Sequence, residues 1–329
     1  MTTVNHKLHE AIQALPFCRL KVTLHFREPG LLPLYKGSML RGNFGRAFKQ
    51  AVCVDRARQC SECVSVAACA YLYVFETPVP KHAARMKKYP TAPHPFIITP
   101  LDGGHRHFEQ GGELEFELTL FGERALSCLP YMIRAFEMAG DNGYGSARIP
   151  AIVKNVCVVS RTGRGQTVYA QDRGMIRNPE QSFFIAPQVA PENGNSISLN
   201  FITPGRLQKE GKILSSFDFR TFVSALLRRF TNMAYFHAGI EVDMDFKEFL
   251  QNAEGVKTDC SGLRRFKWGR YSNRQKQSMD MDGMTGGIVL GKVPPEFMTL
   301  IGFGEIMHVG KNATFGCGGY ALYGIKALP

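Results

Sequence analysis

Residues 18 to 50 read CRLKVTLHFREPGLLPLYKGSMLRGNFGRAFKQ, and this stretch contains the two local patterns from which we predict the fold. Polar and apolar residues alternate from Cys18 to Phe26, which is the two-residue period of a strand with one buried face. A Pro-Gly pair follows and predicts a turn. From Lys36 to Lys49 the apolar residues recur at helical spacing. After a short N-terminal helix, the chain is therefore expected to form a strand, a turn and a basic helix.

The same two patterns continue through the first half of the chain. Alternation predicts strands at 113–121, 151–159 and around 167–170, and helical spacing predicts a helix at 129–140. A strand, helix, strand, strand, helix, strand order over roughly 150 residues is what a ferredoxin-like unit needs.

A change of composition divides the chain. Residues 178 to 195 are rich in Pro, Asn, Gln and Gly, which predicts a boundary near Pro191. We expect one domain at 1–190, with a cysteine-rich insertion, and a second at 191–329. In the second we predict strands at 197–201, 266–271, 284–290 and 320–325 and helices at 217–238, 246–254 and 296–306. The predicted fold class is α+β, with tandem ferredoxin-like (RRM-like) domains and glycine-rich loops.

Positive charge is concentrated in two segments. The chain has 40 Lys and Arg against 28 Asp and Glu, a net charge of +12. Such an excess can serve solubility alone, but Lys36 to Lys49 contains no acid, and Lys257 to Lys276 has seven basic residues and one acid. This clustering favours a polyanionic partner, nucleic acid before membrane. No apolar stretch is long enough for a membrane helix, and the N-terminus lacks signal-peptide features, so we expect a cytoplasmic protein.

The sharpest local motif is HVGKNATFGCGGY, from His308 to Tyr320. Glycines allow backbone N–H groups to approach a phosphate, and Lys311 adds a positive charge. The spacing is not that of a Walker loop. A smaller segment of the same kind, DNGYGSAR, occupies 141–148. The alternative is a glycine-rich turn that joins a helix to the last strand.

Seven segments in a fixed order resemble those of one family. They are LRGNFGRAF from Leu40, the cysteine run followed by AYLYVFETP, PHPF at Pro93, NGYGSAR, NFITPGRL at Asn200, RYSNRQKQSMDMDGMTGG at Arg270 and HVGKNATFGCGGY. The chain thereby resembles the CRISPR-associated endoribonucleases of the RAMP superfamily, which cut precursor CRISPR RNA within each repeat. The resemblance implies paired ferredoxin-like domains, a C-terminal glycine-rich loop that holds RNA, and cleavage that needs no metal or other cofactor.

The reaction that this resemblance implies is attack of a ribose 2′-OH on the adjacent phosphate, leaving a 2′,3′-cyclic phosphate or 3′-phosphate and a 5′-OH. The expected partner is CRISPR repeat RNA (pre-crRNA), and the product would pass to an interference complex. One alternative is a non-catalytic RAMP subunit that binds guide RNA within such a complex. Another is a zinc-dependent nucleic-acid-binding module.

Such an attack requires a base, an acid and a cation beside the phosphate. Histidine suits the first two roles at neutral pH. His308 is the first candidate because it opens the glycine-rich loop, with Lys311 as the cation; its alternative role is to cap the preceding helix. Many relatives carry the catalytic His on or near the first helix, but residues 35–50 contain none. The N-terminal alternatives are His25, His94 and Tyr35, the last with Lys36 and Arg41.

Basic and glycine residues of these segments are the candidates for RNA binding. They are Lys36, Arg41, Arg46, Arg206, Arg264, Arg265, Lys267, Arg270, Arg274, Gly310, Gly316 and Gly318. Trp268 and Tyr271 could stack on unpaired bases, although we favour core packing for Trp268.

Four cysteines lie within a short run at Cys53, Cys60, Cys63 and Cys69. Four thiols on one loop could bind a structural zinc ion, and the alternative is reduced thiols that pack a helical turn. Any such metal would be structural, because four protein ligands leave no position for a reacting water.

Overall fold

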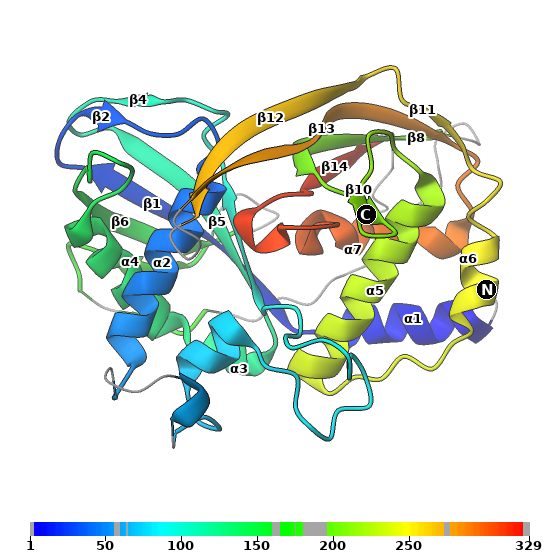
Figure 1. Cartoon of the computed structure of the whole chain (residues 1–329), viewed down its shortest axis with the longest axis horizontal. Coiled ribbons are helices and arrows are strands. Elements are labelled where there is room, and N and C mark those ends of the chain that lie inside the picture. The colour runs from blue at the N-terminus through cyan, green and yellow to red at the C-terminus, as the bar shows by residue number, and fades with distance from the viewer. Residues whose placement is uncertain are drawn as a thin grey trace. The chain divides into compact units, whose positions relative to one another are not determined.

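The structure is a computed structural model (Figure 1) that describes residues 3–55, 60–63, 65–159, 165–174, 176–179, 196–272 and 277–324. The chain forms two compact units. The first unit is Phe17–Ser182, and the second is Met1–Pro16 together with Phe183–Pro329.

An antiparallel sheet of five strands is the frame of the first unit, in the order β3-β5-β1-β6-β7. The strands are β1 (Phe17–Phe26), β3 (Phe96–Pro100), β5 (Glu113–Phe121), β6 (Ala151–Val158) and β7 (Thr167–Ala170). In the β1–β5 register, Phe17 lies opposite Phe121 and His25 lies opposite Glu113. Every second residue of β1 from Cys18 to Phe26 is buried, as the alternation predicts. The side chains between them, from Arg19 to His25, lie on the other face of the sheet.

Two helices, α2 (Gly37–Val52) and α4 (Leu129–Asn142), pack against each other beside this sheet (Figure 1). The ring of Phe44 on α2 stacks on Phe136 of α4 at 4.6 Å between centroids and meets Phe96 of β3 edge-on at 5.6 Å. Both helices thus share one aromatic core with the sheet.

Shorter elements complete the first unit. A ribbon of two strands, β2 (Gly30–Leu31) and β4 (His107–Phe108), forms outside the main sheet. The others are the helix α3 (Glu123–Ser127), a 3₁₀ turn at Cys60–Glu62 and a π-helical turn at Leu72–Glu76.

The second unit repeats this design. Its antiparallel sheet has the order β11-β13-β8-β14, with β12 paired to β13. The strands are β8 (Ser196–Gly205), β11 (Lys257–Asp259), β12 (Leu263–Ser272), β13 (Gln277–Gly291) and β14 (Tyr320–Tyr323). The helices are α5 (Phe219–Ala238), α6 (Phe246–Gln251) and α7 (Pro295–Met307), with a 3₁₀ turn at Ala313–Phe315 and a small β9–β10 hairpin (Gln208–Lys209 and Lys212–Ile213). Rings of Phe230 on α5 and Phe303 on α7 meet edge-on at 5.8 Å, and Phe222 of α5 meets Tyr320 of β14 edge-on at 5.4 Å, so these helices share one core with the sheet.

The N-terminal helix α1 (Thr3–Ala14) packs against α5 and α7. His9 Nδ1 lies 3.2 Å from the hydroxyl of Thr299 on α7, and Lys7 forms a 2.9 Å ion pair with Asp243. This helix therefore belongs to the second unit, which differs from the expected boundaries of 1–190 and 191–329.

The tandem ferredoxin-like fold of class α+β is confirmed, because each unit follows a strand, helix, strand, strand, helix, strand order. The sequence reading did not include β3, because FIITP is a short run without alternation and cannot be assigned by periodicity. No helix in the described ranges is long and apolar enough to cross a membrane.

Candidate functional site

The glycine-rich loop, His308 to Tyr320, begins where α7 ends and is folded tightly on itself and on β8. Gly310 and Gly318 have φ values of 86° and 75°. A Cβ on Gly310 would lie 2.4 Å from the carbonyl oxygen of Arg206, and one on Gly318 would lie 1.8 Å from that of Val309. Only glycine permits these backbone approaches. These glycines, together with Gly316 at φ 80°, therefore have a structural role whatever they bind.

The end of β8 holds this loop through hydrogen bonds. The Thr203 hydroxyl accepts from the N–H of Gly319 at 2.7 Å and donates to the carbonyl of Gly316 at 2.6 Å. The N–H of Gly318 donates to Pro204 at 2.9 Å, and that of Lys311 donates to Arg206 at 2.9 Å. The exposed Lys311 side chain is thus presented from a backbone that is fixed at several points.

Arg206 joins the glycine-rich loop to the β12–β13 hairpin. Its Nε donates to the carbonyl oxygen of Asp282 on β13 at 2.7 Å, and its Nη1 donates to the side chain of Asn312 in the loop. Its guanidinium carbon also lies 5.9 Å from the ring centroid of Trp268 on β12. We predicted that Arg206 binds phosphate, but these donors hold the loop and the hairpin together.

Basic side chains line β12. Arg264, Arg265 and Lys267 are exposed, and Arg265 forms a 2.5 Å ion pair with Asp282. Arg264 donates to the carbonyls of Ser261 and Leu263 at 2.8 and 2.9 Å, which holds its guanidinium at the end of the hairpin. We call Arg264, Arg265, Lys267 and Lys311 the cation row.

Other candidates on this hairpin differ in what the structure says of them. Trp268 is only 6% exposed, so the expected core position is found. The backbone of Arg270 and Tyr271 lies in β12, and Arg274 lies outside the described residues.

His308 is the C-cap residue of α7, and its exposed fraction is 5%. Its Nδ1 lies 3.3 Å from the carbonyl oxygen of Cys317, and a Cβ on Gly319 would lie 2.8 Å from its Cε1. The imidazole therefore packs inside the glycine-rich loop, which fits the alternative role of a cap better than proton exchange with RNA.

Arg229 is a residue that the sequence reading missed. It lies on α5, and its Nε donates to the carbonyl of Met307, the last residue of α7, at 2.9 Å. Burial lowers the pKa of this guanidinium to about 10. A cation at the negative end of α7 fixes the point from which the glycine-rich loop starts. The Arg228-Arg229 pair looks like a solvated helix face, so no sequence signal separates the two.

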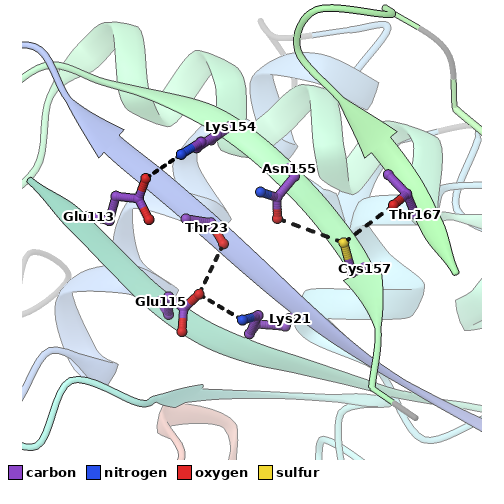
Figure 2. A network of polar contacts seen from close by, with 8 residues as sticks. All are labelled: Lys21, Thr23, Glu113, Glu115, Lys154, Asn155, Cys157 and Thr167. Carbon is purple, nitrogen blue, oxygen red and sulfur yellow. Dashed lines mark hydrogen bonds and ion pairs between the residues drawn. The ribbon is translucent and has the colours of Figure 1, made fainter. Parts of the chain in front are cut away.

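In the first unit, His25 lies on β1 at the end of a row of charge pairs. Its Nδ1 is 4.0 Å from the carboxylate of Glu113, which also forms an ion pair with Lys154 at 2.6 Å. Figure 2 shows this face of the sheet, where Lys21 pairs with Glu115 at 2.8 Å. The hydrogen bond to Glu115 raises the pKa of Lys21. Because acids and bases alternate in pairs, the face has little excess charge to attract RNA.

Figure 2 also shows Cys157 between Asn155 and Thr167. Its Sγ lies 3.8 Å from the Asn155 side chain and 3.7 Å from the Thr167 hydroxyl.

The other N-terminal catalytic candidates are held in local contacts. His94 is half-buried, with its Nδ1 2.9 Å from the hydroxyl of Thr77 and its ring 6.1 Å from that of Phe96. Tyr35 is half-buried and lies two residues before α2.

The expected role of Lys36 in RNA binding is corrected by its burial. Its side chain is 0% exposed, its Nζ forms an ion pair with Asp102, and the same nitrogen donates to the carbonyl of His105. It therefore has no surface to offer a phosphate. Its two neighbours on α2 keep partial access: Arg41 is half-buried over the Phe75 ring at 4.8 Å, and Arg46 is exposed and donates to Asn43 at 2.5 Å.

The four clustered cysteines are those for which we predicted a structural zinc ion. Cys53, Cys60, Cys63 and Cys69 are half-buried and free, and Cys53 Sγ contacts the carbonyl of Asp55 at 3.3 Å. Within the described ranges, no group of three or more His, Cys, Asp or Glu side chains is placed to hold a metal ion. The zinc site stays a prediction from spacing, which the zinc content of the wild type and of Cys60→Ser would decide.

Two family models match the two halves of the chain. One, described as an N-terminal domain, matches residues 15–181, and the other, described as CRISPR-associated endoribonuclease Cas6, matches residues 199–320. Residues 199–320 of the chain belong to the CRISPR-associated Cas6 family. This match supports an RNA endonuclease of CRISPR RNA processing, and the matched range contains both the cation row and the glycine-rich loop.

Known relatives extend along nearly the whole chain. An uncharacterized protein of Archaeoglobus fulgidus is 26% identical over 318 residues, which cover 94% of this chain and 98% of the relative. The fold is similar to that of Thermus thermophilus Cas6, with a TM-score of 0.52, 13% identity, and coverage of 94% of this chain and 98% of the other. A structure titled as a Cas6 product complex has a TM-score of 0.53 and 15% identity, with 93% and 99% covered.

A third similar structure is a Cas6-RT-Cas1–Cas2 complex, with a TM-score of 0.57 and 12% identity. The match covers 95% of this chain and 29% of that one. It shows the Cas6 fold as part of a longer polypeptide.

Proposed function

We propose that this Cas6 protein binds CRISPR repeat RNA along the cation row and the glycine-rich loop. One chain of contacts supports this proposal: the Lys311 N–H bonds to Arg206, Arg206 bonds to Asp282, and Asp282 pairs with Arg265. The loop and the basic strand, whose Lys311 and Arg265 are 311 − 265 = 46 positions apart, thus form one connected surface. Exposed cations on a rigid frame can neutralise the phosphates of an RNA backbone.

The reaction that we propose is cleavage within the repeat by the RNA's own 2′-OH. The 2′-oxygen loses its proton and bonds to phosphorus, while the bond to the 5′-oxygen breaks and that oxygen takes up a proton. This step leaves a 2′,3′-cyclic phosphate and a 5′-OH, and addition of water to the cyclic phosphate gives the 3′-phosphate. This route needs no metal ion, because the nucleophile is within the substrate and Lys311 or an arginine of the cation row can balance the charge on the phosphorane oxygens. The mature guide would then pass to a larger interference complex.

The second candidate function is RNA binding without cleavage, as in a guide-holding subunit of an interference complex. The burial of His308 favours this candidate, because the imidazole predicted to transfer protons is packed against Cys317 and Gly319.

One experiment separates the two functions. Purified protein is incubated with repeat RNA in excess EDTA, and the ends of the products are mapped. A matched RNA with a single 2′-deoxy substitution at the cut site is the control. We expect one cut in the repeat, in EDTA, that disappears with the 2′-deoxy RNA. Tight binding without any cut in EDTA would overturn the metal-independent endonuclease and leave the binding subunit.

A further inference from the structure

The end of the β3–β4 loop and the first residue of β4 carry three exposed basic or titratable side chains in succession, His105, Arg106 and His107. A turn in which the His105 N–H donates to the carbonyl of Asp102 at 3.1 Å precedes them. We call His105 to His107 the histidine segment.

A buried ion pair fixes the position of this segment. The Lys36 side chain at the start of α2 is fully buried and pairs with Asp102, and its Nζ also donates to the carbonyl of His105. The same ammonium lies 5.8 Å from the ring centroid of Phe108. Separating a buried ion pair leaves an uncompensated charge in the interior, which is energetically costly. This pair therefore holds the segment next to the start of α2.

Backbone pairing aligns the segment further. The Leu32 N–H donates to the carbonyl of Arg106 at 2.9 Å, and Leu31 lies opposite His107 in the β2–β4 register. The His105 ring meets the Phe108 ring edge-on at 5.1 Å, and Arg106 Nε lies 3.3 Å from the carbonyl of Leu32. The segment is therefore an ordered ribbon edge whose basic side chains are exposed.

Exposed apolar side chains occur close to this segment. Leu31, Leu34 and Leu101 are exposed, although large apolar side chains are usually buried. Leu34 lies beside Gly104, where an added Cβ would be 3.3 Å from its Cδ1. Cations next to exposed apolar surface offer a nucleotide both of the contacts that it needs, one for the phosphate and one for the face of a base.

The histidines of this segment also meet a requirement that the predicted catalytic histidines meet less well. Proton exchange with RNA needs an imidazole that the RNA can reach. His308 is buried in its loop, and His94 is half-buried against Thr77 and Phe96. His105 and His107 are both exposed, and they lie two residues apart, His105 in the turn before β4 and His107 on β4 itself.

We propose that the histidine segment contacts the RNA at the cut site, that His105 and His107 are the base and the acid of the cleavage, and that Lys36 is a positioning residue for them. This inference rests on the proposed function. One imidazole takes the proton of the 2′-OH as its oxygen bonds to phosphorus, and the other, as imidazolium, gives a proton to the departing 5′-oxygen. At this cut site Arg106 of the same segment, and not Lys311 of the other unit, balances the charge on the phosphorane oxygens.

The test uses the full chain and four variants: His105→Ala, His107→Ala, the double variant and His82→Ala. His82 is the control, because it is an exposed histidine on a turn of the same unit. Single-turnover cleavage of repeat RNA is measured across pH 5 to 9, on the scale at which imidazoles titrate. Affinity is measured with the uncleavable 2′-deoxy RNA.

We expect each single variant to slow cleavage by roughly 100-fold or more and to lose one limb of the pH profile. Affinity for the 2′-deoxy RNA should change far less, and His82→Ala should match the wild type. Should the double variant fail to fold, His105→Gln tests the same role with a side chain of similar size. A double variant that cuts at the wild-type rate with the wild-type pH profile overturns this inference alone. A wild type that binds RNA but never cuts it overturns the proposed function as well.

Discussion

The guanidinium Nε of Arg206 donates to the backbone carbonyl of Asp282 at 2.7 Å, although the two residues are 76 positions apart in the chain. This bond ties the residue that follows β8, to which the glycine-rich loop is hydrogen-bonded, to β13, which forms the basic hairpin with β12. The surface that we propose for RNA depends on it.

Arg206→Ala should therefore weaken both the fold and RNA binding. It removes the bonds to Asp282 and Asn312, and a charged hydrogen bond contributes about 1.5–3 kcal/mol. We expect the free energy of unfolding in urea to fall by about 2–3 kcal/mol and RNA affinity to fall with it. Lys209→Ala, at an exposed position of the nearby β9, is the control. Unchanged stability in Arg206→Ala would show that the loop does not depend on this side chain.

The cation row should determine the salt dependence of RNA binding. Each cation that neutralises a phosphate contributes about 0.7–0.9 to the slope of log affinity against log salt. Arg264→Ala, Lys267→Ala and Lys311→Ala should each reduce the slope by close to one, whereas the exposed Lys212→Ala on β10 should leave it unchanged. Fluorescence anisotropy at four salt concentrations gives the slope. Equal slopes in all variants would place the RNA elsewhere.

Lys36→Met tests the buried ion pair at the start of α2. It leaves Asp102 buried without its cation, which costs about 3–5 kcal/mol. We expect that loss in urea unfolding, and we expect Lys36→Met combined with Asp102→Asn to recover part of it, because the second change removes the unpaired charge. A Lys36→Met protein as stable as the wild type would contradict the burial of this pair.

The buried thiol of Cys18 should make stability depend on alkaline pH. Burial, with a smaller contribution from Glu117, raises the pKa of Cys18 from 9.0 to about 12. Above pH 9 the unfolded chain loses this proton while the folded chain keeps it, so the folded state binds more protons and stability falls as pH rises toward 12. One pH unit within this window is worth about 1.4 kcal/mol.

Cys18→Ala should remove this contribution. Urea unfolding at pH 8, 9 and 10 is compared with the wild type, and the drop from pH 9 to 10 should be smaller in the variant by about 1 kcal/mol. The alanine lowers stability equally at each pH, so the difference between pH values is the informative quantity. Parallel curves would show that the thiol titrates alike in both states.

His308→Ala separates the two roles considered for this residue. Because the ring packs inside the glycine-rich loop, we expect a loss of about 1–3 kcal/mol in the free energy of unfolding and a parallel loss of RNA affinity. A variant of wild-type stability and affinity whose cleavage falls by roughly 100-fold would instead assign proton transfer to His308, and would weigh against the histidine segment.

Local patterns in the sequence were sufficient for much of this protein. Alternation in Cys18 to Phe26 and helical spacing in Lys36 to Lys49 predicted β1 and α2, because the period of apolar residues reports which side of an element is buried. The glycine spacing of His308 to Tyr320 predicted a special loop, because positive φ values need glycine.

The positions of individual side chains were decided by tertiary structure. Lys36 and Arg46 look alike on a basic helix, yet one is buried against Asp102 and the other is exposed. His308 opens the glycine-rich loop and is packed against Cys317, while the carbonyl of His105, in a distant loop, accepts from the buried Lys36 before α2. Burial and pairing depend on partners 9 to 76 residues away, and periodicity carries no information about such contacts. The sequence alone thus determined the family and the fold, and the folded chain decided which of its charges and imidazoles an RNA could reach.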